Sequence, residues 1–95
     1  MTYRAPINDI LLALNHGAGL KAAVEAGHYG DFDPDITTAV LEEAGKFASD
    51  VLAPLNKVGD RNGVKLADGK VTTAPGWPDA YKRWTEAGWN AVSGP

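Results

Sequence analysis

The chain of 95 residues has no cysteine, a single methionine and two phenylalanines. Without cysteine, disulfides and thiolate chemistry are excluded, and so is the usual framework of a small secreted domain. No run of residues approaches the ~20 apolar residues of a membrane-spanning helix. Residues 1–6 also lack the basic flank and apolar core of a signal peptide. We therefore predict a cytoplasmic protein with no membrane span.

Charge and size narrow the class further. Nine basic and twelve acidic residues give a net charge of −3, and the lysines are scattered rather than clustered. A nucleic-acid-binding surface is therefore not expected, because such surfaces gather positive charge. With 44% hydrophobic residues, the chain is long enough for one small domain or part of one.

The first third of the sequence predicts two short helices. Apolar residues recur from Ile7 at helical spacing, with Pro6 suited to the first helical position, and the pattern ends near Gly17. The alanine-rich segment 19–26 predicts a second helix, with Gly27 as a left-handed C-terminal cap.

The strongest periodic signal predicts a long amphipathic helix. Asp33 is its expected N-cap, Pro34 fits the first turn, and Asp35 places negative charge at the positive end of the helix dipole. Pro54 should kink or end the helix, with the last turn reaching about Lys57. The apolar stripe consists of Ile36, Val40, Ala44, Phe47, Val51 and Leu55, and it is widened by Leu41, Ala48 and Leu52.

A change of pattern follows this helix. Residues 60–63 read as a turn, and alternating residues around Asp68-Gly69 predict a small β-hairpin at about 63–73. Two strands alone are marginal in water, so the hairpin needs a neighbouring surface. A last helix is expected at about 79–87, ending at Gly88. The predicted fold class is mainly α with one hairpin.

The motif most suggestive of chemistry is the alternation Asp31, Asp33, Asp35, followed by Glu42, which resembles the ligand spacing of a calcium loop. The sixth position of such a loop requires glycine, and Ile36 stands there. We therefore interpret these residues as helix capping.

Other polar residues also favour structural roles. His16 and His28 are expected near helix ends, and zinc would need further nitrogen or sulfur ligands. Glu42 and Glu43 are adjacent on the long helix, point in different directions and are expected on a solvated flank. No serine or threonine has the context of an activated nucleophile, and the glycines form no phosphate-binding loop.

Three tryptophans, Trp77, Trp84 and Trp89, gather within 13 residues. Each can bury on the order of 150–250 Å². Two interpretations stay open: the rings form the core of this chain, or they form a docking face for a neighbouring domain, with Trp84 and Trp89 the first candidates.

Three segments resemble the N-terminal helical domain of the acyl-CoA dehydrogenase family, in a long bacterial branch. They are residues 44–60, residues 68–76 with Ala80-Tyr81 and Gly88-Trp89-Asn90, and residues 3–10. The resemblance covers essentially all 95 residues. It implies that residues 1–95 are an N-terminal helical-bundle domain, a fragment of a larger multi-domain enzyme.

The resemblance also implies an activity for the larger protein. Such an enzyme uses FAD to oxidise an acyl-CoA thioester to the 2,3-enoyl-CoA in fatty acid metabolism, and electrons pass to an electron-transfer flavoprotein. A glutamate removes the proton next to the carbonyl, and a homo-oligomer is expected. The catalytic and flavin-contacting residues of the family belong to later domains, so no residue here receives a catalytic, cofactor-binding or metal-binding role, and this chain alone is predicted to be inactive.

One alternative belongs to a different class. The chain could be a free-standing small helical module that binds a partner protein through its tryptophan-bearing C-terminal helix. A reading frame that continues past Pro95 into a flavin domain would favour the enzyme, and a stop codon there would favour the module.

Overall fold

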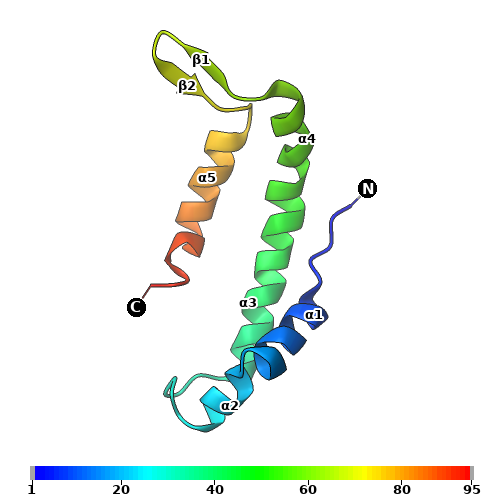
Figure 1. Cartoon of the computed structure of the whole chain (residues 1–95), viewed down its shortest axis with the longest axis vertical. Coiled ribbons are helices and arrows are strands. Elements are labelled where there is room, and N and C mark those ends of the chain that lie inside the picture. The colour runs from blue at the N-terminus through cyan, green and yellow to red at the C-terminus, as the bar shows by residue number, and fades with distance from the viewer. Residues whose placement is uncertain (1, 95) are drawn as a thin grey trace. The chain divides into compact units, whose positions relative to one another are not determined.

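The computed structural model describes residues 2–94, and these form two compact units, residues 2–49 and 50–94. Each unit is described by itself. Helices dominate both, with one two-stranded antiparallel sheet in the second (Figure 1). The predicted fold class, mainly α with one small hairpin, is confirmed.

The first unit contains three α-helices and a π-helical segment. They are α1 (Ile7–Leu12), η1 (Ala13–Gly17), α2 (Leu20–Glu25) and α3 (Pro34–Phe47). Pro6 is the N-cap of α1 rather than its first helical residue. In η1 the amide of Ala18 donates to the carbonyl of Ala13 at 2.8 Å, the five-residue step of a π-helix.

The end of α2 follows the predicted cap. Gly27 has φ +79° and donates to the carbonyl of Val24 at 3.0 Å, while the amide of His28 donates to the carbonyl of Ala23 at 3.1 Å. These are the two hydrogen bonds of a Schellman motif, and they satisfy carbonyls that the helix end leaves open.

The start of α3 also follows its prediction. Asp33 is extended, and its Oδ1 accepts a hydrogen bond from the amide of Asp35 at 2.9 Å. Near the other end, Gly45 is buried against Ala5 and Ile7. A Cβ at this position would lie only 3.3 Å from Ala5 Cβ and from Ile7 Cδ1. The absence of a side chain therefore lets the N-terminal segment lie against α3. Ser49 adds a hydrogen bond from its Oγ to the carbonyl of Tyr3 at 2.9 Å.

This unit covers only part of the predicted apolar stripe. Leu41, Ala44 and Phe47 are half-buried, whereas Ile36 is 48% exposed and Val40 is 42% exposed. The apolar arc of α3 is broader than the elements packed on it. Its Ile36 side is the part left uncovered.

The helix end near Pro54 was wrongly predicted. Helical backbone continues through η2 (Ala48–Leu52, π-helical) and α4 (Ala53–Asn62), past the expected end at Lys57, so residues 60–62 are helical rather than a turn. Pro54 is the second residue of α4 and directly follows the π-helical segment, so the change of hydrogen bonding lies next to the residue that cannot donate an amide hydrogen. Gly63, with φ +64°, follows the helix.

The remaining elements of the second unit are the hairpin and a last helix. They are β1 (Lys65–Ala67), β2 (Lys70–Thr72), α5 (Trp77–Glu86) and the 3₁₀ turn η3 (Trp89–Ala91). Asp68 and Gly69 join the strands with φ values of +52° and +73°, as a type I′ turn requires. Gly88, at φ +82°, follows α5 as predicted.

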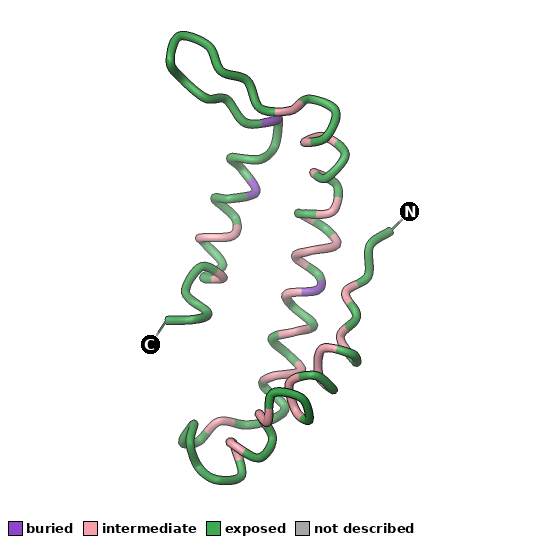
Figure 2. Tube along the Cα trace, viewed as in Figure 1, coloured by how far each residue is buried: buried purple, intermediate pink, exposed green. Residues whose placement is uncertain are grey.

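The second unit has a small interior. Its buried hydrophobic residues among those described are Ala74 and Ala80 (Figure 2). Two glycines let α4 and the start of α5 approach. A Cβ at Gly59 would lie 2.6 Å from Trp77 Cζ2, and one at Gly76 would lie 2.9 Å from Leu55 Cδ2.

Candidate functional site

The acidic residues at the start of α3 have a structural role, because Asp33 accepts a hydrogen bond from a backbone amide of the helix. Asp33 caps the helix and Asp35 lies in its first turn, which confirms the interpretation as capping. Asp31 and Glu42 are exposed. Within residues 2–94 no three His, Cys, Asp or Glu side chains come close enough together to hold a metal ion.

Glu42 and Glu43 are exposed on α3, as predicted. Glu43 pairs with Lys46 at 3.5 Å, and both side chains are largely in solvent. A pair of this kind contributes between about 0 and 1 kcal/mol. These carboxylates therefore form a solvated flank rather than an acid–base pair.

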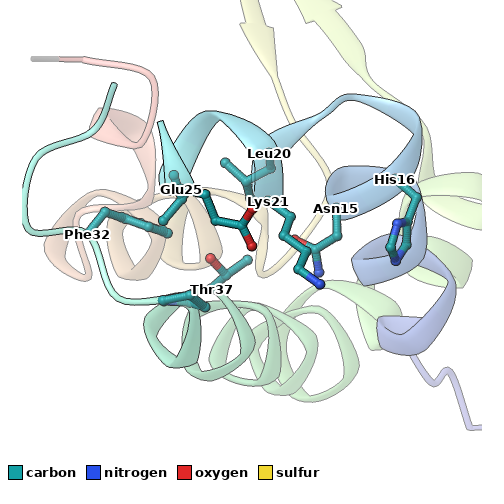
Figure 3. A pocket seen from close by; sticks show the side chains of 9 residues that line it. Asn15, His16, Leu20, Lys21, Glu25, Phe32 and Thr37 are labelled. Atoms are coloured by element: carbon teal, nitrogen blue, oxygen red, sulfur yellow. The ribbon is translucent and has the colours of Figure 1, made fainter. Parts of the chain in front are cut away.

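A cavity of about 300 Å³ lies between α2 and the beginning of α3 in the first unit. Figure 3 shows Glu25 on α2 and Thr37 on α3 directed toward the same space. The lining residues are Asn15, His16, Leu20, Lys21, Val24, Glu25, Phe32, Pro34 and Thr37.

One lining group has no hydrogen-bond partner among the residues that the structure describes. It is the buried Oγ1 of Thr37. Lys21 and Glu25 are exposed and stand one helical turn apart on α2. The lining therefore combines half-buried apolar side chains, Leu20 and Val24, with the exposed charged side chains of Lys21 and Glu25.

This arrangement does not assemble a catalyst. No nucleophile is paired with a base, and both charged lining residues are solvent-exposed, so burial does not favour proton transfer there. Of the two histidines, His16 lines the cavity and His28 does not. Sequence reasoning missed Lys21, Glu25 and Thr37. The spacing of Lys21 and Glu25 by four residues was the available signal, since such residues share a helix face.

The aromatic residues of the second unit divide into two sets. The rings of Trp84 and Trp89 lie 6.2 Å apart at 31°, and both residues are half-buried. Trp77 covers Gly59 while remaining 45% exposed. Tyr81 is exposed. The rings thus contribute to packing and still leave aromatic surface in solvent.

Two exposed ion pairs lie along α5. Arg83 Nε lies 3.2 Å from Asp79 Oδ2, and Lys82 Nζ lies 4.0 Å from Glu86 Oε1, each across one helical turn. Such pairs stabilise an exposed helix by about 0.2–0.5 kcal/mol each. They support the helix without forming a binding site.

Over residues 2–94, no helix is both long and apolar enough to cross a membrane.

Comparison with known proteins identifies the class that the chain resembles. No protein-family model matches the chain. The similarity is to an acyl-CoA dehydrogenase, and it extends over all 95 residues at 35% identity. That relative is the 3-methylmercaptopropionyl-CoA dehydrogenase of Ruegeria pomeroyi, and this chain spans 16% of its length. The resemblance inferred from the residues is confirmed over the whole chain.

Proposed function

We propose that this chain is the N-terminal helical portion of an FAD-dependent acyl-CoA dehydrogenase and has a structural role in that enzyme. The observation that carries the proposal is the match over all 95 residues to a protein named as an acyl-CoA dehydrogenase. The proposed enzyme oxidises an acyl-CoA thioester to the 2,3-enoyl-CoA and passes electrons to an electron-transfer flavoprotein.

The residues of this chain do not fit a flavin by themselves. The cavity of about 300 Å³ is at the lower limit of pockets for drug-sized ligands, and FAD is larger than such a ligand. The glycines are spread singly along the chain, two of them inside α-helices, and residues 2–94 contain no dinucleotide-binding loop. Flavin binding and proton abstraction are therefore assigned to the rest of the proposed enzyme, and no step of the reaction is assigned to residues 2–94.

The structural role is supported by the small number of buried apolar side chains among the described residues. No side chain among the described residues is less than 2% exposed, and the buried hydrophobic residues are two alanines. A domain that folds alone usually encloses large apolar side chains. A portion that packs against further domains leaves such side chains at its surface, as Ile36, Trp77 and Tyr81 are here.

The proposal is tested on the product of the complete reading frame. We expect that protein to purify with bound flavin and to oxidise acyl-CoA thioesters, while the 95-residue chain is colourless and inactive. A reading frame that ends at Pro95, or a longer product without flavin, would reject the proposal. A folded 95-residue product that binds a separate protein would favour the interaction module.

A further inference from the structure

The β1–β2 hairpin has one apolar face. Leu66 pairs directly with Val71, and the two neighbouring pairs are Lys65 with Thr72 and Ala67 with Lys70. Because side chains alternate between the faces of a strand, Leu66 and Val71 share one face and both lysines lie on the other. Leu66 is 74% exposed and Val71 is 66% exposed. The apolar pair is therefore open to solvent.

Nothing in the second unit covers this hairpin. Every residue from Val64 to Thr73 is exposed, and Figure 2 shows this loop of chain as exposed throughout. A two-stranded sheet is at best marginally stable in water without a surface to pack on. The turn is nevertheless specified by Asp68-Gly69, and the register places two aliphatic side chains directly opposite each other. This combination indicates a hairpin that is built to be covered on one side.

We propose that the Leu66–Val71 face is covered by the rest of the same longer protein, which makes the hairpin an internal clasp between this portion and the remaining enzyme. The proposal rests on the proposed function, because it needs a longer chain. The relative supports that occupant, since this chain spans only 16% of the relative's length. The lysine-bearing face is the side that stays in water.

The size of the face argues against a second copy or a separate partner. A specific interface between proteins buries roughly 800 Å² on each partner, far more than two aliphatic side chains provide. Separate partners also lose translational and rotational freedom on binding. A segment of the same chain is held at high effective concentration, so a small apolar face is sufficient.

Hydrogen–deuterium exchange tests the clasp without any substitution. Amide exchange of residues 65–72 is measured in the 95-residue chain and in the product of the complete reading frame, with the amides of α4 as the reference for folding. We expect the hairpin amides to exchange about 100-fold more slowly in the longer protein, the factor expected when two aliphatic side chains become buried. Equal exchange in the two proteins would overturn the proposal. Slow exchange in the 95-residue chain that appears only as its concentration rises, together with a dimer mass, would also overturn it and assign the face to a second copy.

Matched substitutions locate the effect on one face. Val71→Ser should remove at least tenfold of the protection in the longer protein, whereas Lys70→Ser, next to it on the other face, should leave the protection unchanged. Equal losses for the two variants would show that the apolar face is not the one covered. If Val71→Ser prevents the longer protein from folding, Val71→Ala makes the same comparison with a smaller truncation.

The clasp and the proposed function can fail separately. A longer protein that reduces its flavin with acyl-CoA but leaves the hairpin unprotected would reject the clasp alone. A protected hairpin in a longer protein without dehydrogenase activity would reject the proposed function alone. A reading frame that ends at Pro95 would reject both.

Discussion

Replacing Gly59 with alanine tests the contact between α4 and Trp77. Two opposing effects act at this position. Alanine in place of glycine inside a helix stabilises by roughly 0.5–1 kcal/mol. The added Cβ would lie 2.6 Å from Trp77 Cζ2, a distance that requires the ring to move. Forcing extra volume into a packed contact costs about 1–3 kcal/mol.

The steric effect should be larger, because the nearest atoms belong to a rigid indole rather than to the end of a flexible chain. Gly59→Ala is therefore expected to lower the free energy of unfolding by up to about 2.5 kcal/mol, the largest difference between those two ranges. The measurement is urea denaturation followed by far-UV circular dichroism, which does not depend on the tryptophan signal.

Two controls separate the contact from general effects of the substitution. Gly17→Ala, at a site where a Cβ meets nothing within 4 Å, should not destabilise. In a Trp77→Ala background, Gly59→Ala should become stabilising, because only the helix preference remains. If Gly59→Ala stabilises the chain that retains Trp77, the contact between Trp77 and α4 is not formed and the reasoning is wrong.

Three further outcomes follow from single residues. Asp33→Ala should cost about 1 kcal/mol of unfolding free energy by removing the cap of α3, while Asp33→Ser should retain most of it, as measured by urea denaturation. Gly69→Ala should cost about 1–2 kcal/mol of hairpin stability because of its positive φ, and cross-strand NMR contacts between Leu66 and Val71 should weaken; unchanged contacts would contradict the type I′ turn. Thr37→Val should be neutral or stabilising by up to about 1 kcal/mol, since it removes a buried hydroxyl without a partner; a clear loss in thermal denaturation would show that the hydroxyl is hydrogen-bonded.

Local signals in the sequence predicted two helix ends correctly, the start of α3 and the end of α2. Asp33 and Gly27 act through neighbours within a few residues, so their roles can be read from short patterns. The type I′ turn at Asp68-Gly69 is local in the same sense. Pro54 was misjudged because the helical backbone passes from a π-helical segment directly into α4, and the spacing of apolar residues does not reveal that change of hydrogen bonding.

Tertiary packing was less accessible from the sequence. The periodicity of α3 correctly marks apolar residues, but it does not say which of them this chain covers. Ile36 and Val40 belong to the strongest stripe and are exposed, whereas Gly45 is buried through a contact with residues some 40 positions earlier. The cavity beside Thr37 likewise depends on how α2 meets α3. No residue of this chain was predicted to take part in catalysis, and that expectation stays a prediction.

The most direct test of the proposed function is flavin reduction. The product of the complete reading frame is purified and titrated without oxygen against an acyl-CoA thioester, with the 95-residue chain as the control. We predict bound flavin whose oxidised absorbance disappears as the enoyl-CoA forms, and no flavin or turnover in the control. A longer product that holds no flavin, or holds a flavin that acyl-CoA thioesters do not reduce, would contradict the assignment of this chain to an acyl-CoA dehydrogenase.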